Sequence, residues 1–165
     1  MGNDAKDAAA VAKIRGLIEG IEFAMLTTVS PDGSLHSRPM ATQKVEFDGH
    51  LWFFTSFSSQ KVHELKGDFH VAVDYAAPGD RTWVALSGVA NVSRSKKKME
   101  ELWTPELKAY FPDGLDDTDL ALVEIDVMRG EYWEGPGMLT YAVELATALA
   151  TGERVDLGEN EKVSL

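Results

Sequence analysis

The stretch of sequence that decides the fold runs LWFFTSFSSQK from Leu51 to Lys61. Apolar and aromatic residues fill its first half, so the pattern predicts a buried β-strand. Hydroxyl residues follow, and Ser58 or Ser59 can cap a short helix that carries Lys61 in its first turn. The preceding predicted strand carries Arg38 and is joined to this one by an Asp-Gly hairpin turn at 48–49. The sequence therefore predicts two cations and several hydroxyl groups at neighbouring strand ends.

The rest of the chain reads as one domain of antiparallel strands with short helices at its periphery. The predicted strands cover residues 23–29, 35–47, 50–55, 69–75, 82–93, 120–128 and 131–133. The predicted helices cover residues 8–18, 59–66, a stretch from 95, a short one from 105, and 138–151. A single domain over 1–165 is expected, with flexible ends at 1–7 and 153–165. We predict a mainly β fold, a closed or nearly closed β-barrel with peripheral helices, and a bulge at Gly88 inside its strand.

Composition excludes several classes of protein. The 165 residues include 16 basic and 27 acidic side chains, which gives a net charge of -11 and argues against binding to nucleic acid or to anionic membranes. The absence of cysteine excludes disulfides, thiolate metal sites and cysteine nucleophiles. No stretch has the length of a membrane span, and the first residues do not form a secretion signal. We therefore expect a cytoplasmic protein that does not bind membranes.

Arg38 and Lys61 are the candidate ligand-binding residues. Either could be an ordinary solvated surface cation. Their neighbours Thr42, Thr55 and Ser59 favour a second interpretation, because cations, hydroxyl groups and a helix N-terminus together bind phosphate. The aromatic side chains beside them could cover a flat ring. Flavin mononucleotide (FMN) combines a phosphate dianion with such a ring, so FMN is the predicted ligand.

Other candidate residues carry less information. Most aromatic residues, Trp52 and Phe54 among them, can be explained as core. Trp133 lies in EYWEGPG, an exposed setting in which a large aromatic side chain would meet a ligand or a partner. The four histidines lack the spacing of metal ligands, so no metal site is predicted. No nucleophile elbow, phosphate-binding glycine loop or general base stands out, and the catalytic residues stay unassigned.

Taken in order, these motifs resemble the flavin-binding split barrels related to pyridoxamine 5'-phosphate oxidase. The segments that carry the resemblance are AMLTT (24–28), PDG (31–33), RPM (38–40), LWFFT (51–55), SQK (59–61) and LSGVA (86–90). Two further segments, LWTPELKAYFPDGLDD (102–117) and EYWE (131–134), are similar to the general stress protein 26 branch. The resemblance covers roughly residues 11–152.

The resemblance implies a split-barrel homodimer that binds FMN in grooves between its subunits. By position, Arg38 and Lys61 match the arginine and lysine that bind the phosphate, and Ser59 precedes the lysine as in the family. Gln60 stands where the family usually has a further phosphate-binding arginine. The remaining matches are to flavin contacts: Met40, Ala41, Thr42, Phe54, Thr55, Trp83 in place of a glutamine, and Trp133 as an aromatic residue supplied by the second subunit.

Activity is left open by the sequence. The chain lacks the C-terminal Arg-x-His element of the authentic oxidases after Trp133, so oxidation of pyridoxamine phosphate is not expected. The resemblance implies either a flavin-dependent oxidoreductase, in which the flavin transfers hydride or electrons, or a binder that stores or senses flavin. An enzyme that uses the deazaflavin F420 and a barrel without cofactor are further alternatives. FAD in place of FMN also stays open.

Overall fold

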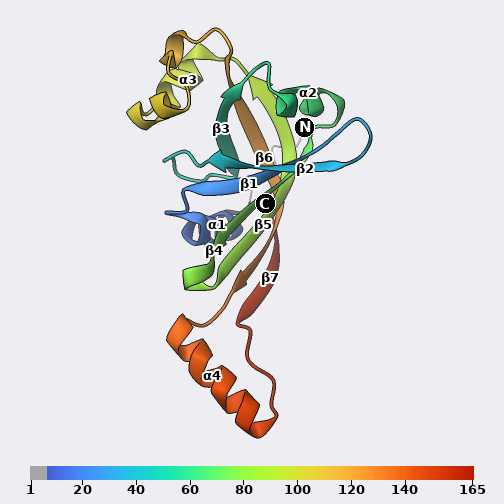
Figure 1. Cartoon of the computed structure of the whole chain (residues 1–165), viewed down its shortest axis with the longest axis vertical. Coiled ribbons are helices and arrows are strands. Elements are labelled where there is room, and N and C mark those ends of the chain that lie inside the picture. The colour runs from blue at the N-terminus through green and yellow to red at the C-terminus, as the bar shows by residue number, and fades with distance from the viewer. Residues whose placement is uncertain (1–6) are drawn as a thin grey trace.

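Strands with alternating apolar side chains form one antiparallel sheet in the computed structural model, which describes residues 7–165 (Figure 1). The strands are β1 (Phe23–Val29), β2 (Leu35–Ala41), β3 (His50–Ser56), β4 (His70–Ala77), β5 (Thr82–Ser93), β6 (Leu120–Glu134) and β7 (Glu159–Ser164). Each of β1, β4 and β5 buries every second residue, so one face of the sheet lines the core and the other faces outward.

The strand order is β2-β1-β4-β5-β6-β3, and β7 pairs with the end of β6. The sheet curls strongly, and the strands at its two ends, β2 and β3, contact each other (Figure 1). No hydrogen-bonded ladder joins β2 to β3 within residues 7–165. The barrel is therefore split along this line. The sequence-based prediction of a mainly β split barrel is confirmed.

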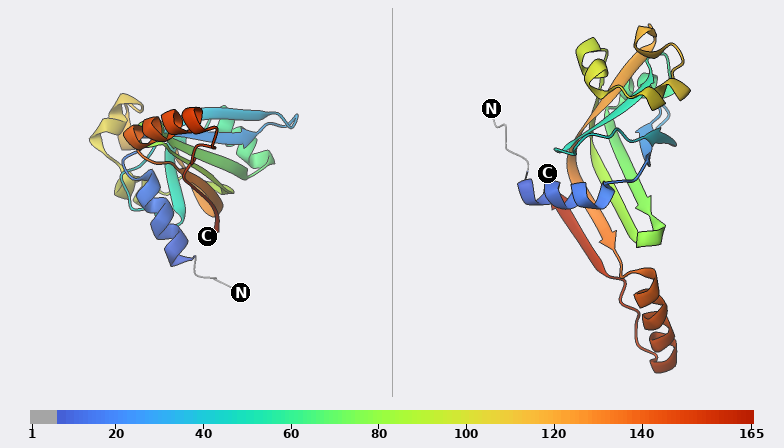
Figure 2. Two further views of the ribbon diagram at one scale, coloured as in Figure 1. Left: turned by 90° about the horizontal axis from the view of Figure 1, so that it is seen from below. Right: turned by 90° about the vertical axis from the view of Figure 1, so that its left-hand side faces the viewer.

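The helices are placed around the sheet (Figures 1 and 2). They are α1 (Ala8–Ile18), α2 (Gln60–Gly67), α3 (Lys96–Leu102) and α4 (Met138–Thr151), with short 3-10 helices η1 (Pro78–Asp80), η2 (Pro105–Ala109) and η3 (Gly114–Asp116). Asp7 caps α1 by accepting hydrogen bonds from the amides of Ala9 and Ala10. Residues 1–7 were predicted to be flexible, and residues 1–6 lie outside the described part of the chain.

The inner faces of the strands and the apolar side of α1 form the main hydrophobic core. Ile14 of α1 and Leu26 of β1 are completely buried there, together with Phe53, Val73 and Tyr132. A smaller core lies between β3, β6 and the segment that contains α3 and η2. Both faces of β3 are thus covered, which explains why its sequence is an almost continuous apolar run.

Gly88 was predicted to interrupt its strand, and it does. The register of β5 against β6 shifts between Ser87 and Gly88. A Cβ atom on Gly88 would lie 2.1 Å from the carbonyl oxygen of Asp126, so any larger residue would collide with backbone. The close approach of the two strands therefore requires glycine at this position.

The larger differences from the prediction concern β2, β6 and the tail of the chain. The strand predicted over 35–47 ends at Ala41, after which the chain forms a loop. The two strands predicted at 120–128 and 131–133 are one strand, β6, because pairing with β5 on one side and β7 on the other carries it through Gly130. The tail after Gly152, predicted to be flexible, contains β7, whose residues pair with β6 from Arg129 to Glu134.

Candidate functional site

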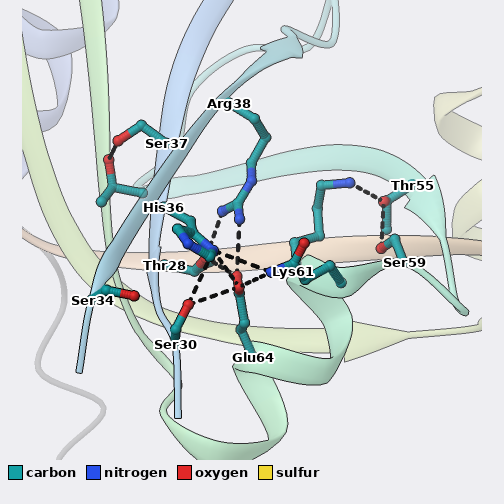
Figure 3. Close-up of polar contacts among 12 residues, drawn as sticks. Thr28, Ser30, Ser34, His36, Ser37, Arg38, Thr55, Ser59, Lys61 and Glu64 are labelled. Carbon is teal, nitrogen blue, oxygen red and sulfur yellow. Dashed lines mark hydrogen bonds and ion pairs between the residues drawn. The ribbon is translucent and has the colours of Figure 1, made fainter. Parts of the chain in front are cut away.

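The buried carboxylate of Glu64, on α2, is the centre of a polar cluster inside one end of the barrel (Figure 3). Arg38 of β2 donates from Nη2 to Glu64 Oε2 at 2.9 Å and from Nη1 to Thr28 Oγ1 at 2.5 Å. Thr28 in turn donates to the same carboxylate oxygen at 2.5 Å. Two nitrogens of the guanidinium group are thus held from the interior, which leaves its other N–H groups free to bind a ligand.

Three more side chains surround the other oxygen of the Glu64 carboxylate. His36 Nδ1 lies 2.7 Å from Oε1, Ser30 donates to it at 3.0 Å, and Gln60 donates to it at 2.9 Å. Burial by itself raises the pKa of Glu64, but the hydrogen bonds from Thr28, His36, Ser30 and Arg38 outweigh it and lower the pKa to about 2. Glu64 is therefore ionised and joins α2 to β1 and β2.

Lys61 and its hydroxyl neighbours lie beside this cluster (Figure 3). Lys61 Nζ donates to Thr55 Oγ1 at 3.0 Å, and the hydroxyl groups of Thr55 and Ser59 are 3.3 Å apart. Ser59 is the N-cap residue of α2, yet its hydroxyl does not cap the helix. Burial, and then the positive charge of Arg38, lower the pKa of Lys61. The charge of Glu64 partly opposes this lowering, but Lys61 forms no salt bridge with any residue from 7 to 165, so this half-buried cation at a helix N-terminus has no carboxylate within ion-pair distance.

An apolar cleft of about 820 Å³ opens where β2 ends and β3 begins. Its lining includes Ala41, Thr42, Phe53 and Tyr75 together with the C-terminal end of α1 and part of η2. The hydroxyl groups of Thr42 and Tyr75 are buried and make no hydrogen bond of acceptable geometry. Burial raises the pKa of Tyr75 to about 12, and the nearby Thr42 hydroxyl only partly opposes this. Two buried hydroxyl groups beside an apolar cleft can bind the polar edge of a flat ligand.

The structure brings most of the predicted residues to these two places. Arg38, Thr55, Ser59, Gln60 and Lys61 gather around the Glu64 cluster, and Ala41 and Thr42 line the cleft.

Four predicted residues lie elsewhere within the single chain. Met40 is in the main core, and Phe54 packs against Trp103 with ring centroids 5.5 Å apart in the smaller core. Trp83 and Trp133 face each other across β5 and β6, half-exposed, on the outer face of the sheet. Neither tryptophan contacts the cluster, so any role beside the flavin would require a second copy of the chain.

Sequence analysis missed Glu64, the residue with the most polar contacts in the site. It also missed Thr28, Ser30 and His36. A signal was available: Gln60 and Glu64 are four residues apart on one predicted helix and must share a face with Lys61. The partners of that face on β1 and β2 are 26 to 36 residues away and could not be read from spacing.

Among residues 7–165 there is no group of three or more His, Cys, Asp or Glu side chains that could hold a metal ion. In the same part of the chain, no helix is both long enough and apolar enough to cross a membrane.

The fold and the site together define a split barrel with a cationic, hydroxyl-rich cluster and an apolar cleft. The chain belongs to the pyridoxamine 5'-phosphate oxidase like family, whose model matches residues 9–156. The chain is similar to the solved structure of a protein assigned as general stress protein 26 of Jannaschia sp. CCS1, with a TM-score of 0.74, 22% identity, and coverage of 96% of this chain and 100% of that chain.

Two other relatives extend the comparison. The general stress FMN/FAD binding protein of Xanthomonas citri has a TM-score of 0.66 and 25% identity, with coverage of 78% of this chain and 90% of that one. Protein bli-3 of Neurospora crassa is 25% identical over 154 residues, which are 87% of this chain and 74% of the relative.

Proposed function

We propose that the protein binds FMN, with the phosphate held by Arg38 and Lys61 and by the hydroxyl groups of Thr55 and Ser59. The observation that carries this proposal is the unpaired ammonium group of Lys61, half-buried beside a second cation and at the N-terminus of α2. Glu64 already balances the charge of Arg38, so the positive charge that a bound anion can neutralise is that of Lys61. A phosphate monoester is a dianion and accepts several hydrogen bonds, so it matches this arrangement.

The flavin ring is assigned to the cleft at the other end of β2. Arg38 and Ala41 are three residues apart, or about 10 Å along an extended strand, which a ribityl phosphate can span. Thr42 and Tyr75 would supply hydrogen bonds to the polar edge of the ring, which would relieve the two unpartnered hydroxyl groups. The name of the Xanthomonas citri relative, which mentions both FMN and FAD, supports a flavin ligand.

Bound FMN would supply hydride or electron transfer, while the chain would bind it, orient it and exclude water. No side chain of the site is an evident general base, because Glu64 is ionised but surrounded by donors. We place the flavin in a homodimer, since Trp83 and Trp133 can reach a flavin only from a second copy. Turnover with a reduced nicotinamide and an electron acceptor would distinguish an oxidoreductase from a protein that only stores or senses flavin.

A fluorescence-quenching titration with FMN and with riboflavin tests the phosphate site. Loss of a hydrogen bond to a charged group weakens binding by about 1.5–3 kcal/mol. At roughly 1.4 kcal/mol per factor of ten, Arg38→Ala should weaken FMN about ten- to a hundredfold and leave riboflavin almost unchanged. Lys61→Ala should act in the same direction but less, because lysine makes a point contact. Lys97→Ala, at an exposed position of α3, is the matched control and should change neither affinity.

The contacts of Glu64 require one further variant. Arg38→Ala leaves the buried carboxylate without its cation, which can destabilise the fold. The double change Arg38→Ala and Glu64→Gln removes both charges and isolates the effect on phosphate binding. Equal losses of FMN and riboflavin affinity in Lys61→Ala and in the double variant would refute the assignment.

A further inference from the structure

Helix α4 is the most exposed element of the molecule. It projects from the end of the sheet as an arm, together with the segment 152–158 that returns beside it (Figures 1 and 2). None of its 14 residues is buried, although all but four are apolar. The four polar residues are Thr140, Glu144, Thr147 and Thr151, which fall on one side of the helix at 3.6 residues per turn. A wide apolar surface is therefore left uncovered in the single chain.

The base of the arm is held by contacts with the sheet, although the side chains along α4 are exposed. The arm connects β6 to β7, which pair up to Glu134 and Glu159, so both of its ends are anchored on the sheet. Arg81 stacks on Tyr141 with 3.5 Å between Cζ and the ring centroid, and its carbonyl accepts a hydrogen bond from Gly135 N at 2.9 Å. These contacts hold the first turn of α4 at Arg81, while the helix extends away from the sheet (Figure 1).

A second surface with large apolar side chains lies on the outer face of the sheet, where the carboxylates of Asp74 and Glu131 share the row of Met25. Registers across β1, β4, β5 and β6 place its members in two adjacent rows on one face. Its large members, each about 40–50% exposed, are Phe23 (49%), Met25 (41%), Trp83 (39%) and Trp133 (38%). The arm of the same chain does not lie over this outer face (Figure 2). A single chain thus exposes two apolar surfaces that it cannot cover by itself.

We infer that α4 is a docking arm that packs on a second copy of this chain and, with the outer sheet face, forms the dimer interface. The two surfaces carry nine large apolar side chains that are 38–82% exposed in the single chain, and a standard interface buries roughly 800 Å² on each partner. In a twofold dimer, each copy offers both surfaces and receives both, so neither stays uncovered. The inference rests on the proposed homodimer and specifies which part of the chain holds it together.

The chemistry of the arm disfavours other occupants. Helices that lie on membranes carry lysine or arginine on their polar face, whereas α4 has neither. A helix of 14 residues is also marginal in water without a packing partner. The net charge of -11 further opposes an anionic lipid surface.

Sedimentation velocity over a dilution series tests the arm in the full-length protein. The test variant is Leu139→Glu with Leu149→Glu, at positions 82% and 80% exposed in the single chain, so the fold of the monomer does not depend on them. The matched control is Thr140→Glu with Thr147→Glu, which adds the same two charges on the polar side. Because each change occurs twice in a symmetric dimer, the leucine variant should weaken dimerisation at least about a hundredfold, and the control less than about threefold.

Hydrogen exchange of the amides of residues 138–151 gives a second readout. We expect protection in the wild-type dimer and loss of protection in the leucine variant at concentrations at which it is monomeric. If the wild type is a monomer at 100 µM, which is far above the dissociation constant of a stable dimer, both the homodimer and the docking arm are overturned. If the wild type is a dimer and the leucine variant dimerises equally well, the docking arm alone is overturned. The same holds if the amides of α4 are unprotected in the wild-type dimer. Cosedimentation of the monomer with vesicles of phosphatidylcholine and phosphatidylserine would assign α4 to a membrane and would also overturn it.

Discussion

The ionised carboxylate of Glu64 should make the free energy of unfolding depend on pH. The substitution Glu64→Gln should remove this dependence. The pKa of Glu64 is about 2 in the folded protein, against an ordinary value of 4.5. The difference of about 2.5, at roughly 1.4 kcal/mol per pH unit, corresponds to about 3 kcal/mol of stabilisation. Because the pKa is lowered on folding, this stabilisation is fully present above pH 4.5 and is lost as the pH falls toward 2. The side chain is only 1% exposed, so solvent screens it little.

Urea unfolding of wild type and Glu64→Gln at pH 7 and pH 3, without added flavin, measures this contribution. At pH 7 the variant should be less stable by about 3 kcal/mol, since it also leaves Arg38 without its carboxylate. At pH 3 the difference should shrink by about 2 kcal/mol, because the carboxyl group is then protonated in the unfolded chain while it is still largely ionised in the folded protein. Glu100→Gln, exposed on α3, is the control and should show no such change. A difference between wild type and Glu64→Gln that is the same at both pH values would refute the reasoning.

Three further predictions concern the phosphate site, the reaction and the sheet. Gln60→Arg should tighten FMN binding roughly tenfold and leave riboflavin binding unchanged in the same quenching titration, because it adds a cation at the N-terminus of α2. An FMN affinity equal to that of the wild type would contradict this prediction. The protein should not form pyridoxal phosphate from pyridoxamine phosphate, as followed by absorbance, and a rate like that of an authentic oxidase would overturn this. Gly88→Ala should lower the free energy of unfolding by about 3 kcal/mol because its Cβ meets the Asp126 carbonyl, whereas Gly79→Ala, with no atom within 4 Å, should be neutral in thermal unfolding.

The local sequence pattern was sufficient to predict the strands whose apolar and polar side chains alternate, and the turns between them. The strand 23–29, the strand 82–93 and the helix 8–18 were predicted with the bounds that the structure has. The sequence also placed Lys61 in the first turn of a helix, as the structure has it. Arg38 was expected near a strand end and lies in the middle of β2. The family resemblance, which the match over residues 9–156 confirms, rests on the order of these local motifs.

Contacts between distant elements decided the rest. Glu64 is an ordinary helix residue in the sequence and becomes the centre of the site only when α2 packs on β1 and β2, since five donors from three elements then meet one carboxylate. β7 has the polar sequence ENEKVS, which carries no strand pattern of its own. It forms because the free edge of β6 offers backbone hydrogen bonds, and a sheet edge satisfies those groups whatever the side chains are. Sequence patterns record local burial, whereas pairing of backbone and of buried charge depends on which segments the whole fold brings together.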